Sequence, residues 1–257
     1  MTVCIVQGGK GGVGASLVAV NLAAALSRRD RTLLIDLDPW SGGDDLLLDL
    51  KPHFSWLDLL PVIGELRRTH LERVCVPYSA KMQFLPASQI WPTAPEWRKL
   101  SNILSDLEPH YPWIVLDLPP WVEAVGDLDL HPHDRLRLLI LTPDPSAMRA
   151  GRRWLFQLPM VWRDRTKLIV NQHTERHPAS PSRIADSLGI ELLGSTPIDS
   201  RAVGYQINFG RCCVEDGRSQ FGCAVDQIAE RLVRSLQPGL TSPIREPFSN
   251  PGVNKEA

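Results

Sequence analysis

The sequence predicts an α/β domain built on a doubly wound, mainly parallel sheet with helices on both faces. Short apolar runs alternate along the chain with longer amphipathic stretches, as strands and crossover helices do in such folds. Most of these runs lack the polar–apolar alternation of a half-exposed strand, which favours strands buried on both faces. A glycine-rich turn joins the first apolar run to the first amphipathic stretch, as in phosphate-binding domains.

Seven strands are expected where the apolar runs are short, at residues 3–7, 32–37, 82–86, 113–118, 137–141, 167–171 and 191–193. Amphipathic helices are expected at residues 16–28, 95–107, 146–156, 182–188 and 224–236. The crossovers between parallel strands should be right-handed. Residues 52–80 and 119–135 are rich in Pro, His and Trp and should form connecting loops with short helices.

Length and composition indicate one folded domain. The chain has 257 residues with 43% hydrophobic residues, enough for a sizeable core. We expect the domain to span residues 1–237 and the proline-bearing residues 238–257 to form a disordered tail. The net charge of −1 argues against bulk electrostatic binding of nucleic acid. Five cysteines, no export signal and no apolar run near the ~18–20 residues of a membrane span predict a soluble cytoplasmic protein.

The segment from Gln7 to Ser16 carries the strongest functional signal. It follows an apolar strand, opens an amphipathic helix and has five glycines within residues 8–14. Glycines let successive backbone N–H groups point into one concavity, and the helix N-terminus adds about half a positive charge. Ser16 would place its hydroxyl on Mg²⁺. A glycine-rich turn without a ligand is the alternative, and the strand–loop–helix context argues against it.

The order of residues in this loop resembles the deviant Walker A loop of the MinD/ParA family. Lys10 stands early, and Ala15 stands where the usual motif has its phosphate-binding lysine. The resemblance implies a nucleotide-sandwich homodimer in which Lys10 reaches the partner's phosphates, with ATP and Mg²⁺ as ligands. The nucleotide-binding residues it implies in the loop are Gly9, Lys10, Gly11, Gly12, Val13, Gly14, Ala15 and Ser16.

Further landmarks of the family appear in order and cover most of the chain. The segment that ends in Asp36 and Asp38 resembles switch I, which implies that Asp36 helps hold hydrated Mg²⁺ and that Asp38 orients the attacking water. Asp117 ends a strand that resembles Walker B and would face the metal through water. Asn171 would read the adenine edge, and the loop at Pro197 would close over the base.

Because Ala15 replaces the usual lysine, we expect a low rate of ATP hydrolysis. An ammonium group ~4 Å from a phosphate oxygen is worth ~4 kcal/mol at an effective dielectric of 20. The predicted protein therefore still binds ATP but is at most a slow ATPase, with Lys10 and Asp38 in the catalytic roles. An engineered substitution at position 15 is one alternative. The other is a natural loss, since residues 36–48 and 54–60 resemble the CpaE/TadZ branch, also called septum-site-determining-like in actinobacteria.

That branch implies a positioning switch for Flp-type pilus, secretion or division-site machinery, reaching a pole or envelope site through partners. A DNA-partitioning ATPase is a rival, because Arg149, Arg152 and Arg153 cluster on one expected helix, although a solvated helix face explains such a cluster more simply. A scaffold that has lost nucleotide binding is the second rival. The C-terminal sequence lacks the basic and apolar faces of a membrane-anchoring helix. The cysteines lack metal-ligand spacing and are expected to be buried or loop thiols.

Overall fold

The computed structural model describes residues 2–40, 42–90, 92–120 and 135–236 of the chain. The expected tail at 238–257, and most of the expected loop at 119–135, lie outside the described residues.

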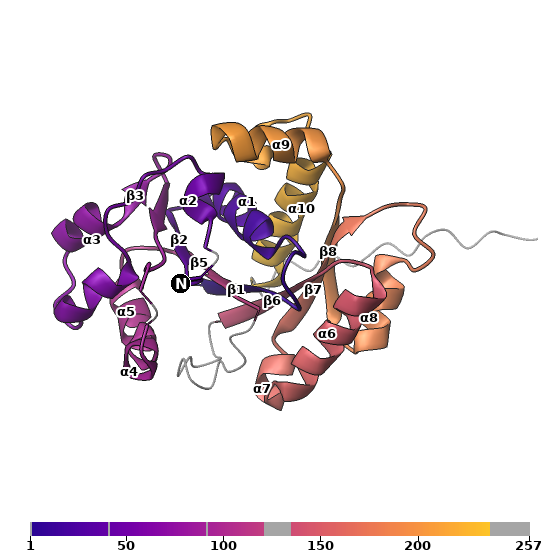
Figure 1. The fold of residues 1–257 in the computed structure, drawn as a ribbon, viewed down its shortest axis with the longest axis horizontal. Coiled ribbons are helices and arrows are strands. Elements are labelled where there is room, and N and C mark those ends of the chain that lie inside the picture. Colours follow the sequence, from indigo (N-terminus) through magenta and orange to yellow (C-terminus); the bar gives the residue numbers. More distant parts are fainter. Residues whose placement is uncertain (1, 41, 91, 121–134, 237–257) are drawn as a thin grey trace, which may run out of the picture.

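One mainly parallel sheet runs through the molecule (Figure 1) and confirms the predicted fold class. Its strands follow the order β3-β4-β2-β5-β1-β6-β7-β8. Seven strands run parallel to one another, and β3 at the edge is antiparallel to β4. The strand bounds are β1 Thr2–Gly8, β2 Thr32–Asp36, β3 Val76–Pro77, β4 Met82–Leu85, β5 Trp113–Leu118, β6 Arg135–Leu141, β7 Thr166–His173 and β8 Glu191–Pro197.

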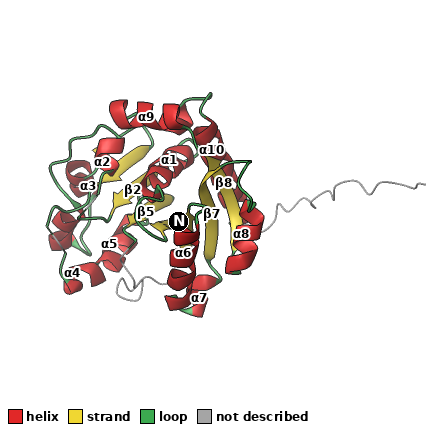
Figure 2. Cartoon of the chain, turned by 45° about the vertical axis from the view of Figure 1, so that its right-hand side comes forward, coloured by secondary structure: helices red, strands yellow, loops and turns green. Residues whose placement is uncertain are grey.

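Helices cover both faces of the sheet (Figures 1 and 2). The long helices α1 and α10 pack against each other on one face, and α6 and α8 lie on the other. The helix bounds are α1 Ala15–Ser27, α2 Asp44–Leu47, η1 Trp56–Val62, α3 Arg68–Val74, α4 Ala94–Arg98, α5 Leu100–Leu107, α6 Pro145–Gln157, α7 Met160–Arg163, α8 Pro181–Leu188, α9 Ser200–Phe209, η2 Cys213–Glu215 and α10 Gln220–Ser235.

Burial on both faces explains the unbroken apolar runs in the sequence. Every residue of β2 and of β6 is buried, as expected for central strands of a parallel sheet. The core continues from these strands into α1, where ten consecutive residues are buried. The sheet is therefore a rigid support for the loops at its carboxyl edge.

Several elements depart from the sequence expectations. The helix expected at residues 95–107 is two helices, α4 and α5, which meet at Lys99. The sequence interpretation did not include β3, α2, α7 or α9 as separate elements. Of these, α2 carries a residue of the site described next, and α9 contacts α2.

Candidate functional site

The phosphate loop follows β1 and opens directly into α1. Gly12 and Gly14 have φ angles of +80° and +81°, a left-handed backbone that glycine adopts at little cost. Gly14 is the N-cap of α1, and no side chain caps the helix. Gly11 and Gly12 are exposed, and Ala15 and Ser16 are half-buried. The first turn of α1 therefore presents uncapped N–H groups at an open surface, which is the arrangement that binds phosphate.

Asn171 supports this loop from the end of β7. Its Nδ2 donates to the backbone oxygen of Val13 at 2.7 Å, and its Oδ1 accepts from the Thr196 hydroxyl at 2.6 Å. A Cβ atom at Gly14 would collide with Asn171 Nδ2, so this contact also requires glycine. Pro197, the other residue expected near the base, ends β8. The expectation that Asn171 reads adenine stays a prediction.

Three buried aspartates lie behind the loop. Asp36 on β2 and Asp117 on β5 are direct neighbours in the parallel register, so their side chains share one face of the sheet. Asp44, at the start of α2, joins them, and one carboxylate oxygen from each residue lies within 4.8 Å of the others. The Ser16 side chain acts to lower the pKa of Asp117, so the loop hydroxyl lies close to the same cluster. Sequence analysis identified three of these four residues and missed Asp44.

Burial shifts the ionisation of all three carboxyl groups. It raises the pKa of Asp36 to about 7, opposed by hydrogen bonds from the Asp38 and Asp44 N–H groups and reinforced by the charge of Asp38. Burial also raises the pKa values of Asp44 and Asp117 well above the usual range, and the charges of the other aspartates add to this effect. Oxygen donors of this kind, gathered without a balancing ion pair among the described residues, fit a hard divalent cation such as Mg²⁺.

Asp38 lies at the mouth of the cluster. Its Oδ1 accepts the Trp40 N–H at 3.0 Å, and its own N–H donates to Asp36 Oδ1 at 2.9 Å. The loop turns tightly at Gly42, where a Cβ atom would stand 2.7 Å from Asp36 Oδ2. Beyond these residues opens a hollow of about 530 Å³, lined by Asp36, Asp38 and the exposed Trp40 among others. Asp38 therefore lies between the aspartate cluster and the open hollow.

Lys10 is half-buried on the other side of the loop. Its charge contributes to lowering the pKa of Asp144, the N-cap residue of α6, although hydrogen bonds to Asp144 act more strongly. Further along α6, Arg149, Arg152 and Arg153 line a shallow hollow together with Phe156. The arginine cluster of the sequence is thus a surface cluster on one helix.

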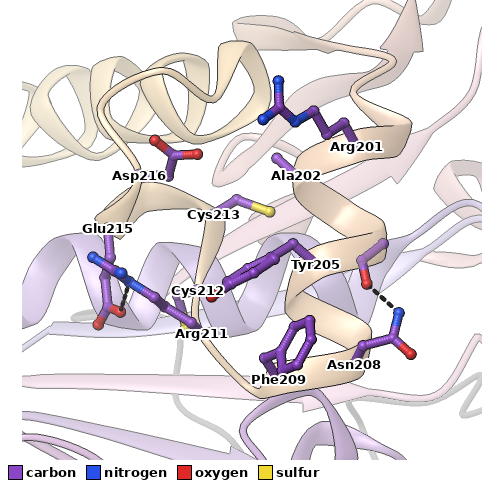
Figure 3. Close-up of a pocket in the computed structure, with 11 residues that line it drawn as sticks. Arg201, Ala202, Tyr205, Asn208, Phe209, Arg211, Cys212, Cys213, Glu215 and Asp216 are labelled. Atoms are coloured by element: carbon purple, nitrogen blue, oxygen red, sulfur yellow. Dashed lines mark hydrogen bonds and ion pairs between the residues drawn. The ribbon is translucent and has the colours of Figure 1, made fainter.

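A separate hollow of about 500 Å³ lies between α9 and η2 (Figure 3). Tyr205 and Phe209 from α9 line it together with Arg211 and Cys212. Helix α9 was not expected from the sequence, although Asp199 and Gly210 mark its two ends. Helix α9 also contacts α2, since Gln206 Nε2 donates to the Leu47 oxygen at 3.4 Å. Its position connects the loop after Pro197 to the segment that carries Asp44.

The cysteines are not a metal site in the described part of the chain. All five are free, and only Cys223 is exposed. Burial raises the pKa of the Cys212 thiol to about 12, so this group is a poor nucleophile at neutral pH. No described helix is both long and apolar enough to cross a bilayer.

A buried strand, an open glycine loop at a helix start and a carboxylate cluster beside it define a phosphate-loop α/β nucleotide-binding domain. The chain belongs to the CobQ/CobB/MinD/ParA nucleotide binding domain family, whose model matches residues 4–232. The resemblance to the MinD/ParA superfamily is thereby confirmed.

The similar proteins are mainly division-site proteins. The septum site-determining protein MinD of Synechocystis sp. is 28% identical over 90% of this chain and 88% of its own length. MinD of Bacillus subtilis is 24% identical over 91% of this chain and 90% of its own length. An uncharacterized protein of Mycobacterium tuberculosis is 52% identical, but over 22% of this chain and 16% of its own length.

Solved structures agree on the fold. A ParA family ATPase from Chlorobium tepidum superposes with a TM-score of 0.79 at 19% identity, covering 90% of this chain and 98% of that one. MinD from Aquifex aeolicus superposes with a TM-score of 0.75 at 25% identity, covering 93% and 99%. MinD from Pyrococcus horikoshii, solved with Mg-ADP, has a TM-score of 0.73 at 23% identity and covers 95% and 100%.

Proposed function

We propose that the protein binds ATP·Mg²⁺ and acts as a nucleotide-dependent dimeric switch. The observation that carries this proposal is the open phosphate loop, with uncapped N–H groups at α1 and with Ser16 close to the aspartate cluster. In this proposal Ser16, Asp36 and Asp117 hold Mg²⁺ and Asp38 orients water. Lys10 acts across a homodimer interface. Bound Mg²⁺ would neutralise charge on the phosphates and on the buried carboxylates at once.

Hydrolysis in this proposal is slow or absent. The loop supplies N–H donors and Mg²⁺, but Ala15 supplies no charge of its own chain to the transferred phosphate. Phosphoryl transfer depends on neutralising charge that develops in the transition state, so a loop lacking that cation binds better than it catalyses. A turnover near the ordinary ~10 s⁻¹ would contradict this part of the proposal.

The proposed cellular role is to position a pilus, secretion or division apparatus. It rests on the resemblance of residues 36–48 and 54–60 to the CpaE/TadZ branch and on the MinD relatives. A structure of a MinC:MinD complex from Aquifex aeolicus illustrates that a protein of this fold can bind a protein partner. We propose a cytoplasmic protein that reaches its site through such partners.

A second candidate function is DNA partitioning, favoured by Arg149, Arg152 and Arg153 on the surface of α6. No acidic residue lies on this helix to offset the three charges. The candidate predicts ATP-dependent, salt-sensitive binding to DNA that the double variant Arg152→Glu with Arg153→Glu abolishes. If DNA binding changes neither with ATP nor with these substitutions, this candidate is eliminated.

The test of the proposed function is the mass in solution without nucleotide, with ADP·Mg²⁺ and with ATP·Mg²⁺, measured by light scattering. We expect the 28.7 kDa monomer to double its mass with ATP·Mg²⁺ alone. A calorimetric titration with ATP accompanies it, and binding no tighter than millimolar would refute the nucleotide-binding half. An unchanged mass together with tight ATP binding would refute the dimeric switch but support ATP as the ligand.

A further inference from the structure

Asp44 is the least expected residue of the aspartate cluster. It is fully buried, and neither of its carboxylate oxygens has a hydrogen-bond partner in the described structure. One carboxylate oxygen of Asp117 is likewise buried without a hydrogen-bond partner. A buried carboxylate normally has hydrogen bonds or an ion pair, because removing a charge from water without compensation is costly.

The surroundings of Asp44 do not supply that compensation. Asp36 differs from Asp44 in this respect, since it accepts the N–H groups of Asp38 and of Asp44 itself. Among the described residues, no lysine, arginine or histidine forms an ion pair with Asp36, Asp44 or Asp117. Ala15, in the adjoining loop, contributes no positive charge. The three carboxyl groups therefore lie close together with no positively charged side chain paired to them among the described residues.

We propose that Asp36, Asp44 and Asp117 form a direct binding site for a divalent cation. The ion binds there even when no nucleotide is bound. The three donor oxygens lie within 4.8 Å of one another, close enough to share one ion. Asp44 is then a metal ligand, distinct from the residues assigned to hydrated Mg²⁺ under the proposed function. The proposal does not depend on ATP binding, because all three ligands come from the protein.

The chemistry of the donors selects the class of ion. Carboxylate oxygens suit hard cations such as Mg²⁺, Mn²⁺ and Ca²⁺, whereas described cysteines and histidines lie outside the cluster. Ser16, which lies close to Asp117, would offer its hydroxyl to the bound ion as a further oxygen donor. A cation already in place would prepare the loop for a phosphate, since it supplies positive charge beside a loop that has Ala15 in place of lysine.

The experiment is a titration of the nucleotide-free protein with Mn²⁺, followed by electron paramagnetic resonance, which separates free from bound ion. Asp44→Asn is the test variant, because it keeps the shape of the side chain and removes its charge. Asp49→Asn is the matched control. Asp49 lies five positions on, is exposed and has a φ of +49°, a conformation that asparagine tolerates.

We expect the natural chain and Asp49→Asn to bind one Mn²⁺ with the same affinity, and Asp44→Asn to bind at least about tenfold more weakly. Added Mg²⁺ should compete with Mn²⁺ for the site. Absence of Mn²⁺ binding by the natural chain without nucleotide would overturn the proposal. Equal affinity in the natural chain and in Asp44→Asn would overturn it as well.

Thermal unfolding provides a second readout that does not require a spectroscopic ion. In chelator, Asp44→Asn should unfold at a higher temperature than the natural chain, because it removes a buried, uncompensated carboxylate. Mg²⁺ should stabilise the natural chain more than the variant, since an ion that binds the folded state raises its stability. An Mg²⁺ effect of the same size in both chains would contradict the proposal. Failure of ATP to bind in the separate calorimetric titration would leave these results unaffected.

Discussion

The side chain at position 15 sets how much charge the phosphate loop can offer. Gly12 and Gly14 have the left-handed backbone that the loop requires, and the helix start is uncapped, so the backbone supplies N–H donors for a phosphate. The methyl group of Ala15 is uncharged, so it adds no positive charge for binding a phosphate. In the proposed function, phosphate binding therefore depends on Mg²⁺ and on Lys10 of the partner subunit.

Replacing Ala15 by lysine should strengthen ATP binding at least about tenfold. An ammonium ~4 Å from a phosphate oxygen is worth ~4 kcal/mol at an effective dielectric of 20, of which desolvation and side-chain ordering remove a part. Calorimetric titration with ATP·Mg²⁺ measures the change. Ala15→Gln has similar reach without charge and is the control. Equal affinities in the two variants would show that charge at this position is not what limits binding.

Arg137 is a second residue with an unusual environment, in the middle of β6. Its guanidinium lies 5.2 Å from the ring centre of Trp154 and 5.1 Å from that of Trp162. Its Nη1 donates to Gln7 Oε1 at 3.3 Å, and burial lowers its pKa to about 9. The flat, weakly hydrated guanidinium suits a position between two aromatic rings, where the compact ammonium of lysine does not.

Arg137→Lys should therefore lower the free energy of unfolding by about 1–2 kcal/mol, since it loses two cation–π contacts and buries a more strongly hydrated charge. Urea denaturation measures the loss. Arg183→Lys, on the exposed surface of α8, is the control and should leave stability unchanged. Equal stability of the Arg137→Lys variant and the natural chain would mean that the aromatic pair does not select for a guanidinium.

Among the elements, α6 has a clear N-terminal signal. Asp144 Oδ1 accepts the N–H groups of Ser146 and Ala147, each at 3.0 Å. Hydrogen bonds from Ser146, Thr142 and the Ala147 N–H hold the pKa of Asp144 well below its usual range. The ionised side chain is therefore the form that stabilises the helix.

Asp144→Ala should cost about 1 kcal/mol of stability near neutral pH, the usual value of an N-cap side chain. Because the pKa of Asp144 is lower in the folded chain than in the unfolded chain, its contribution is complete above the unfolded pKa of about 4 and is lost as the pH falls further. The difference between variant and natural chain, measured by denaturation, should shrink below about pH 4. A difference that stays constant with pH would contradict the role of the ionised cap.

The sequence predicted elements well where a local signal marks them. Strands β5 and β2 are built on short apolar runs, and their observed bounds lie within one residue of the expected ones. The two-residue strand β3 has no such signal, because it is defined by its pairing with β4. Helix α9 was not predicted, although Asp199 caps its start and Gly210 its end, since the only prediction for this stretch was a loop at Pro197.

Some residues of the site are marked by the local sequence, whereas others join the site only through the tertiary fold. The glycine loop and the aspartates that end β2 and β5 could be predicted, because each stands at the carboxyl end of an apolar run. Asp44 follows no strand and precedes a helix of four residues. What makes it part of the cluster is the tight turn at Gly42, whose N–H donates to the Asp38 oxygen at 3.0 Å and after which Asp44 lies beside Asp36. Such a return is a property of the folded chain and cannot be predicted from local sequence patterns.

At the scale of the whole molecule, the question is whether two chains meet across the nucleotide. Lys10 lies half-buried at the loop and pairs with no aspartate of the cluster. The proposed switch assigns this charge to the phosphates of the partner subunit. A residue with that role contributes little to the folded monomer, so the monomer and the dimer respond differently to its removal.

Lys10→Ala should therefore fold with unchanged stability but fail to double its mass in ATP·Mg²⁺, as followed by light scattering. Lys51→Ala, which removes an exposed charge outside the loop, is the matched control and should dimerise as the natural chain does. If Lys10→Ala still dimerises with ATP, the lysine acts within its own chain and the interface must be held by other groups. If the variant loses stability without nucleotide, Lys10 supports the fold itself, through neighbours such as Asp144, and its assignment across the interface is wrong.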